Sequence, residues 1–306
     1  MSQSTRLWAA LLSVYVIWGS TYLAIALAVE TMSPTFAVST RYVAAGALLC
    51  AWLVWRTGWR ALVVTRTELG SIALVAVLLI GANVLLFYAE RTVPTSLASL
   101  IIASVPLIVA TLRIAAGDRP PALVLAGIGA GFVGIAVLVR PSGDADVTGI
   151  ALVVGSALAW ATGSFLSPRL PLPRSSLTVT TLQMLVGGLI FLPLGLATAP
   201  EAGEVSARSL AGWAYLVVFG ALVGYTAYVW LLAHAPIGLV ATYAYVNPVV
   251  AIALGTMVLD ESLTTGIVVG ATIVLTSVAV VVRREPPSAE PVPLAAEPRT
   301  GSTIER

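Results

Sequence analysis

The chain contains ten successive runs of about 20 mainly apolar residues, joined by short links that hold most of its charge. A bilayer core about 30 Å thick needs roughly 20 apolar residues per helix, so each run is long enough to cross it. Helices are expected rather than strands, because backbone in lipid must satisfy its hydrogen bonds internally and these runs are apolar on all faces. The expected spans are 7–29, 35–55, 69–89, 93–114, 121–139, 147–167, 176–197, 209–231, 237–259 and 263–282.

The composition excludes several classes of protein. Apolar residues make up 58% of the chain and charged residues 10%, whereas soluble domains have roughly 45–50% apolar residues. That balance excludes a soluble globular enzyme and nucleic-acid binding driven by charge. A lone Cys50 cannot form an internal disulfide. The sequence has one histidine, no cluster with metal-ligand spacing and no nucleophile–His–acid set, so we expect no enzyme, no cofactor and no metal.

The two ends of the chain differ from each other. The run 7–29 could be read as a signal peptide, but its length exceeds the usual apolar core of about 7–15 residues. Residues 284–306 are rich in Pro, Glu and Ser and have no apolar period, which predicts a disordered tail on the cytoplasmic side.

Arginine placement predicts the orientation, since the chain has no lysine. With the N-terminus in the cytoplasm, the inside segments carry twelve arginines and the outside loops carry three. This bias favours both termini in the cytoplasm, an even number of spans and a multi-pass protein of the cell (inner) membrane. The outside arginines are Arg91, Arg140 and Arg208.

An internal repeat relates the two halves at one constant offset along the sequence. The pairs are Trp18 with Trp160, Arg41 with Gln183, Gly46 with Gly188, Gly70 with Gly212, Pro94 with Pro236, Pro106 with Pro248 and Asp118 with Asp260. Each unit, 7–140 and 147–283, then holds five helices. Because five is odd, the second unit enters the membrane inverted. The expected fold is an all-α integral membrane protein of ten helices in two inverted repeats, an arrangement typical of transporters.

Four segments carry a family resemblance: WGSTYLAIALAV (18–29), VPTSLASLIIASVPL (93–107), SALAWATGSFL (156–166) and ATYAYVNPVVAIALGTMVLDESL (241–263). The chain resembles the EamA family of the drug/metabolite transporter superfamily over about residues 7–282. The resemblance implies a ten-helix carrier with a central cavity, and export or exchange of small organic solutes such as amino acids, other metabolites or drug-like compounds. It does not name the cargo or a coupling ion.

Arg41 lies about six residues into the second span and allows two interpretations. Its head could reach the interface or pair with Glu30 or Glu90. Alternatively it contacts an anionic group of the substrate, because charges inside a membrane usually face a cavity. Gln183 occupies the equivalent place in the second half.

The fourth and ninth spans each start near a proline and contain another, which predicts kinks that serve as hinges. These prolines are Pro94, Pro106, Pro236 and Pro248. Polar residues near the kinks are candidates for a cavity lining or for hydrogen bonds between helices. They are Ser99, Tyr243, Tyr245 and Asn247.

Aromatic and hydroxyl residues also lie in the middle of the first and sixth spans, where Trp and Tyr are unusual. They predict a symmetric pocket wall, with core packing as the alternative. The members are Trp18, Ser20 and Tyr22 with Trp160 and Ser164; Asn83 and Tyr225 add polar groups on the third and eighth spans.

Glycines in the fifth and tenth spans have the spacing of helix-packing motifs: Gly127 with Gly131, and Gly266 with Gly270. Residues 129–134 also match a dinucleotide fingerprint, but that motif needs a preceding strand and here lies within an apolar run. These glycines are expected to pack helices closely or to form the face of a homodimer.

The function that these features favour is a carrier that works by alternating access, with a small organic solute and the lipid bilayer as its partners. A channel or a structural membrane protein is the alternative. The acids Glu90, Asp260 and Glu261 all lie at span ends. An absence of acids at mid-membrane favours exchange or uniport over proton coupling.

Overall fold

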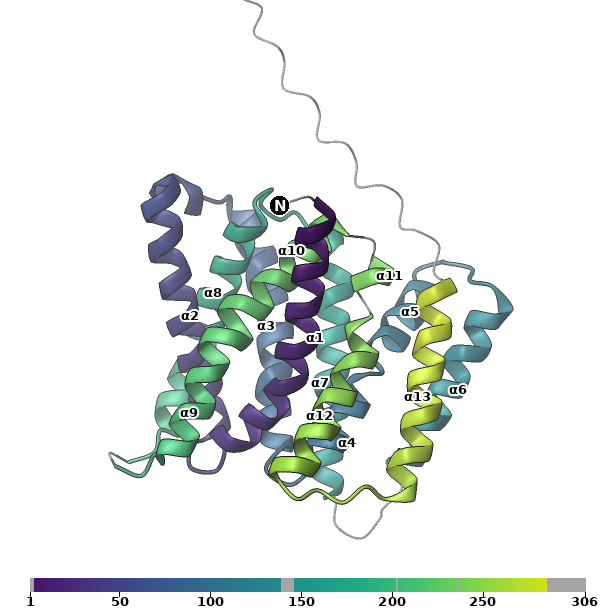
Figure 1. Ribbon diagram of the computed structural model, residues 1–306. Coiled ribbons are helices and arrows are strands. Elements are labelled where there is room, and N and C mark those ends of the chain that lie inside the picture. Colours follow the sequence, from purple (N-terminus) through teal and green to yellow (C-terminus); the bar gives the residue numbers. More distant parts are fainter. Residues whose placement is uncertain (1–2, 139–145, 202, 236, 241, 285–306) are drawn as a thin grey trace, which may run out of the picture.

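A computed structural model describes residues 3–138, 146–201, 203–235, 237–240 and 242–284, and these residues form a helical bundle without β-strands (Figure 1). The helices before residue 139 are α1 (Gln3–Ala28), α2 (Pro34–Thr57), η1 (Trp59–Leu62), α3 (Arg66–Ala89), α4 (Thr95–Ile102), α5 (Val105–Ala115) and α6 (Ala122–Leu138). The later ones are α7 (Val147–Leu166), η2 (Ser167–Arg169), α8 (Ser176–Ala197), α9 (Ala207–Tyr215), η3 (Leu216–Tyr225), α10 (Thr226–His234), α11 (Ile237–Val240), α12 (Tyr243–Val258) and α13 (Thr265–Arg284).

Helix occupies every one of the ten expected spans, so the all-helical prediction is confirmed for the described residues. In this part of the chain, 8 helical segments are long and apolar enough to cross a membrane, and Ala122–Leu138 and Val246–Val258 are shorter apolar helices. Ten crossings therefore remain a prediction, as does the disorder of the tail, of which residues 285–306 lie outside the described part.

Side chains that precede the helices satisfy their free N–H groups. Ser33 accepts from the N–H of Phe36 at the start of α2, and Asp146 accepts from Thr148 and Gly149 at the start of α7. Ser, Thr and Asp are the residues preferred at this position, because their oxygens pair donors that have no carbonyl partner within the helix. The helix starts are therefore fixed by local sequence.

Large apolar side chains cover the outside of the bundle. Trp55 is 78% exposed and Met257 is 79% exposed. In water such a surface would drive association, whereas in a bilayer it faces acyl chains of similar polarity. The structure thus agrees with the membrane location that the composition predicts.

Helices α2 and α8 cross at two glycines. A Cβ on Gly46 would lie 2.9 Å from the backbone nitrogen of Leu185, and a Cβ on Gly188 would lie 2.8 Å from that of Val43. Glycine permits this approach because it has no side chain. The two contacts are reciprocal, since Leu185 and Gly188 are the repeat equivalents of Val43 and Gly46.

The chain enters and leaves the bundle on one side. The start of α1 and the last residues of α13 lie at the same end in Figure 1, and the α1–α2 and α3–α4 connections lie at the other end. We call the end that holds the start of α1 the terminal end, and the other the distal end.

Candidate functional site

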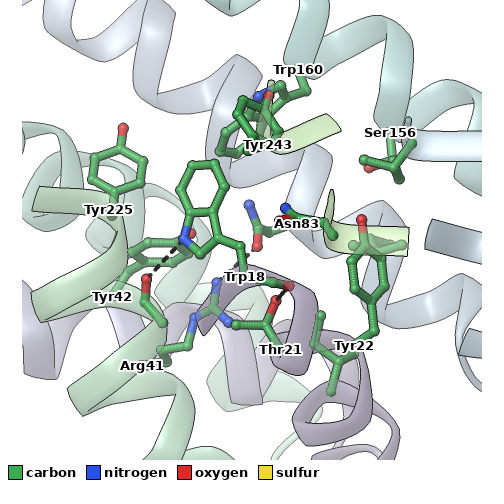
Figure 2. A pocket seen from close by; sticks show the side chains of 15 residues that line it. Trp18, Thr21, Tyr22, Arg41, Tyr42, Asn83, Ser156, Trp160, Tyr225 and Tyr243 are labelled. Atoms are coloured by element: carbon green, nitrogen blue, oxygen red, sulfur yellow. Dashed lines mark hydrogen bonds between the residues drawn. The ribbon is translucent and has the colours of Figure 1, made fainter. Parts of the chain in front are cut away.

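A cavity lies inside the bundle between the two halves of the chain (Figure 2). The cavity together with the solvent-filled space at its opening has a volume of about 690 Å³. Its walls come from α1, α2, α3 and α4 of the first half and from α7, η3 and α12 of the second. Mostly apolar cavities with a few polar groups are the usual form of small-molecule sites.

Eight of the thirteen predicted binding residues line this cavity. The aromatic ones are Trp18, Tyr22, Trp160, Tyr225 and Tyr243. The polar ones are Arg41, Asn83 and Asn247. Arg41 is the one charged residue in the described lining, so the cavity combines an aromatic wall with a single cation.

Four of the remaining predicted residues lie behind the lining or away from it. Ser20 hydrogen-bonds with the hydroxyl of Tyr215 at 2.6 Å, and Ser99 donates to the carbonyl of Ser96 at 2.8 Å. Gln183 stands behind Tyr225, whose hydroxyl donates to its Oε1 at 2.7 Å. Ser164 is not part of the lining. The thirteenth residue, Tyr245, has a side chain outside the described part of the structure.

The Arg41 side chain is buried in the protein, with 4% exposure. Its Nη2 donates to Oδ1 of Asn83 at 2.8 Å, and the Asn83 amide in turn donates to the Leu79 carbonyl at 3.0 Å. No ion pair joins Arg41 to either predicted carboxylate: Glu30 pairs with Arg208 at 3.1 Å, and Glu90 has no partner among the described residues. The described structure thus holds Arg41 inside the protein without either of the two ion pairs considered for it.

Three aromatic rings of the cavity lining meet at one wall, and the ring of Tyr228 packs against Trp18 outside the lining. The Trp18 ring centroid lies 5.7 Å from that of Trp160, 5.4 Å from that of Tyr243 and 4.7 Å from that of Tyr228. The pairs of Trp18 with Trp160 and Tyr243 are edge-to-face, an arrangement that is favourable for aromatic rings. The wall joins both halves, because Trp18 lies on α1 and Trp160 on α7.

Asn247 fixes α12 against α1. In the amide orientation that matches donors with acceptors, its nitrogen donates to the carbonyls of Tyr15 and Tyr243, each at 3.2 Å. A buried amide needs such partners, since an unpaired one costs about 1–3 kcal/mol. Asn247 therefore has a structural role in addition to its place in the lining.

Sequence reasoning missed several lining residues, among them Tyr42, Ser156 and Gly220. Gly220 belongs to η3, a π-helix within the expected span 209–231, and its carbonyl accepts from the Trp18 indole at 3.4 Å. π-Helical turns often occur at functional sites. No local signal in the sequence marked this turn, apart from the two glycines of η3.

The predicted hinge prolines lie at helix starts or within helices. Pro94 precedes α4, and Pro106 is the second residue of α5, which follows a break at Ala103 and Ser104. Pro248 lies inside α12. Pro236 lies outside the described residues.

Three of the four predicted packing glycines contact another helix. A Cβ on Gly127 would lie 3.1 Å from Val281, one on Gly131 would lie 2.2 Å from Leu107, and one on Gly270 would lie 2.5 Å from Leu138. Gly266 meets only Thr264, close to it in sequence. The described structure therefore gives Gly266 no helix to pack against, and the homodimer stays a prediction.

Two acidic residues lie at the distal end. Glu261, after α12, accepts hydrogen bonds from Thr95 and Ser96 at the start of α4. Glu90, directly after α3, is 8% exposed, and neither of its carboxylate oxygens has a partner among the described residues. Burial raises the pKa of Glu90 well above its ordinary value, and the charge of Glu261 raises it further. Glu90 is therefore expected to hold its proton to a higher pH than an exposed glutamate does.

The chain is similar in sequence to a protein family and to several individual proteins. The model of the EamA-like transporter family matches residues 6–140 and again 147–283. The chain is 32% identical over 269 residues to the inner membrane transporter YedA of Escherichia coli K12, covering 85% of each chain. It is 26% identical over 281 residues to the protein PecM of Dickeya dadantii, covering 87% of this chain and 88% of PecM.

The fold has a counterpart among solved structures. One crystal structure superposes with a TM-score of 0.65 at 19% sequence identity, over 91% of this chain and 96% of the other. An all-helical membrane bundle with a central cavity, together with these relatives, defines a membrane transporter. The chain belongs to the EamA-like transporter family.

Proposed function

We propose that this protein carries a small organic solute across the inner membrane, by export or exchange, through alternating access of two inverted five-helix halves. The halves are 7–140 and 147–283, and both termini face the cytoplasm. The observation that carries the proposal is the central cavity, since residues of both halves wall it. A solute held there changes compartments when the halves rock about it.

Contacts repeated at one offset support two related halves. Arg41 bonds to Asn83 in the first half, and Tyr225 bonds to Gln183 in the second. Gln183 and Tyr225 are the repeat equivalents of Arg41 and Asn83. Trp18 and Trp160, related by the same offset, contact each other. An axis of twofold pseudosymmetry that passes between these two rings accounts for all three contacts.

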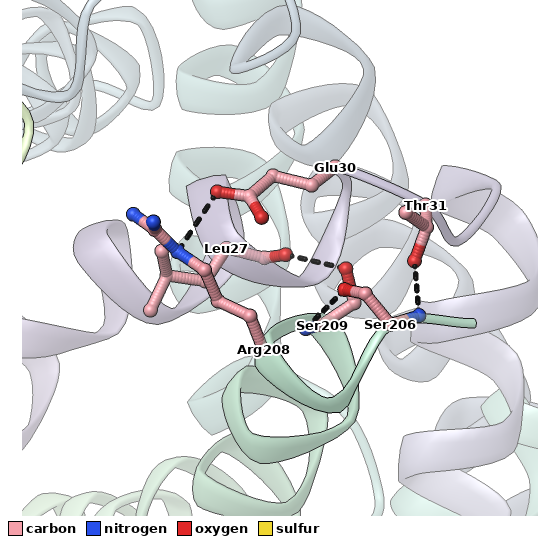
Figure 3. Close-up of polar contacts among 6 residues, drawn as sticks. All are labelled: Leu27, Glu30, Thr31, Ser206, Arg208 and Ser209. Carbon is pink, nitrogen blue, oxygen red and sulfur yellow. Dashed lines mark hydrogen bonds and ion pairs between the residues drawn. The ribbon is translucent and has the colours of Figure 1, made fainter.

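Polar contacts join the two halves at the distal end (Figure 3). Glu30 pairs with Arg208 at 3.1 Å, Thr31 accepts from the N–H of Ser206 at 3.0 Å, and Ser209 donates to the carbonyl of Leu27 at 2.8 Å. These contacts join the end of α1 and the residues directly after it to the start of α9 and its N-cap residue. Opening this end requires them to break, so they form a gate in the proposed cycle.

Helix breaks give the halves places to bend. The α4–α5 break before Pro106 divides one predicted span, and Pro248 lies inside α12. A proline cannot donate to the preceding turn, so a bend there costs fewer hydrogen bonds. Pro106 and Pro248 are the hinges in this proposal.

Counterflow in proteoliposomes tests carrier activity. Purified protein is reconstituted into vesicles loaded with unlabelled amino acids, other metabolites or cationic drugs, and the uptake of trace labelled solute is measured. Saturable uptake that depends on the internal solute is expected. Flux that does not saturate would instead support the alternative of a channel, and no flux for any solute would contradict transport.

Reversible locking tests alternating access itself. Glu30→Cys with Arg208→Cys, in a Cys50→Ser background, places one thiol on each side of the distal gate. A cleavable bifunctional thiol reagent is expected to abolish counterflow, and reduction is expected to restore it. The two single-cysteine variants are the controls. Full counterflow in the cross-linked protein would contradict movement at this gate.

A further inference from the structure

Arg41 is a buried cation without a counter-ion in the described structure. Its one hydrogen bond goes to the neutral amide of Asn83, and its Nε has no acceptor. A guanidinium stays charged in proteins, and an isolated charge away from water is costly. The fold therefore retains a cation at a position where helix packing alone would favour an apolar or neutral side chain.

Neighbouring rings hold the Arg41 guanidinium in place. Its Cζ lies 4.4 Å from the ring centroid of Tyr42 and 5.1 Å from that of Phe87. Contacts of a cation with ring faces are favourable, but they give the Arg41 Nε no acceptor. The group is thus positioned in advance for an anion, with less ordering needed at the moment of binding.

No other residue in the described lining of the cavity carries a charge that could neutralise Arg41. Arg41 is the one charged residue in the described cavity lining, which also includes Trp18, Trp160 and Tyr243 (Figure 2). A ligand that matches this cavity needs one anionic group and a flat apolar body that packs against the rings. A second negative charge would be buried without a partner and would oppose binding.

We propose that the cavity binds an organic monocarboxylate, with its carboxylate on Arg41 and its planar apolar body against Trp18 and Trp160. A carboxylate suits this role because its two oxygens match the fork of a guanidinium. This inference rests on the proposed function only for the movement of the ligand, because binding requires no transport.

Ligand binding to purified protein in detergent is the first test. Benzoate, benzamide and phthalate serve as probes: benzamide keeps the ring without the charge, and phthalate adds a second carboxylate. Benzoate is expected to raise the thermal unfolding midpoint in a concentration-dependent manner and to alter the fluorescence of the cavity tryptophans. Benzamide and phthalate are expected to act at much higher concentrations. Equal effects of benzoate and benzamide would overturn the proposal, and so would equal effects of inorganic phosphate and benzoate.

Two variants of the cation test the same site. Arg41→Gln removes the charge and is expected to weaken benzoate binding by about 30-fold or more. Asn83→Asp keeps Arg41 but gives it an internal carboxylate, so it is expected to lose binding while the protein remains folded. Arg60→Gln, at an exposed arginine of η1, is the matched control. Benzoate binding unchanged in both Arg41→Gln and Asn83→Asp would overturn the proposal.

The outcomes separate this inference from the proposed function. Benzoate binding without counterflow of any solute would leave the site in place and contradict the carrier. Counterflow of neutral solutes that is insensitive to Arg41→Gln, with no benzoate binding, would support the carrier and overturn the monocarboxylate site.

Discussion

Glu261 caps the start of α4 through Thr95, although the two residues lie in different halves of the chain. Its Oε1 accepts the backbone N–H of Thr95 at 2.6 Å and the Thr95 hydroxyl at 2.7 Å, and its Oε2 accepts the N–H of Ser96 at 3.0 Å. A carboxylate at a helix N-terminus pairs free donors and complements the helix dipole. This cap ties the end of α12 to α4 and so joins the two halves.

Loss of this cap is expected to destabilise the protein. Glu261→Ala leaves the N–H groups of Thr95 and Ser96 without their acceptor, at a cost of about 1–2 kcal/mol. Unfolding by sodium dodecyl sulfate in mixed micelles measures the change. Asp260→Asn, next to Glu261, is the control, because asparagine tolerates the positive φ of 55° at that residue. Equal stabilities of Glu261→Ala and Asp260→Asn would contradict this role.

Glu90 is expected to make stability depend on pH. Its pKa in the folded protein is raised by burial and by Glu261, so the folded chain retains a proton that the unfolded chain releases above about pH 4.3. Stability is therefore fully present below that pH and falls as pH rises toward the folded pKa, by about 1.4 kcal/mol per pH unit.

The variant Glu90→Gln removes this titration. It is expected to match the parent protein at acidic pH and to exceed its unfolding midpoint at neutral and alkaline pH. Thermal unfolding in detergent across a pH series measures the difference. Glu201→Gln, at an exposed acid, should follow the parent at each pH. A constant offset between Glu90→Gln and the parent at all pH values would argue against a raised pKa.

Helix contact at Gly188 is expected to exclude any side chain. A Cβ there would lie 2.8 Å from the backbone nitrogen of Val43 and 3.2 Å from the carbonyl of Ser39, and backbone atoms cannot move aside as a side chain can. Gly188→Ala should cost about 1–3 kcal/mol. Gly129→Ala, on an exposed face of α6 with no atom within 4 Å, should be neutral or slightly stabilising. The same unfolding assay compares the two, and comparable losses would refute the contact argument.

Sidedness is expected to follow the arginine bias. In a Cys50→Ser background, Asp146→Cys lies at the distal end, before α7, and Arg60→Cys lies in η1 at the terminal end. A membrane-impermeant thiol reagent added to intact cells should label the first and not the second. The reverse pattern would place the termini outside the cytoplasm.

Polar residues within apolar runs were the part of the site that could be predicted. Arg41 and Trp18 are conspicuous there, because polar and large aromatic groups within a membrane span need a protein or water contact, and both line the cavity. Serines carry a weaker signal, since a hydroxyl can bond to its own helix. Ser99 does so, and it lies outside the lining.

The acids at the distal end could not be interpreted in the same way. Glu90 and Glu261 follow helices, where an exposed carboxylate is common, and nothing near them in sequence indicates that one is buried and the other caps α4. Glu261 finds its partners in the opposite half of the chain, and the burial of Glu90 depends on how the helices pack.

The sequence by itself determined that the chain is an all-helical membrane protein, because hydropathy is summed over each run and needs no knowledge of its neighbours. It also predicts that the two halves are inverted repeats, which stays a prediction. Only the tertiary structure decided which side chains share the cavity, since that depends on the rotation of each helix about its axis and on where a helix breaks or widens. These are set by contacts such as Gly46 on Leu185 and by the π-helical turn at Gly220, which arise only when helices pack.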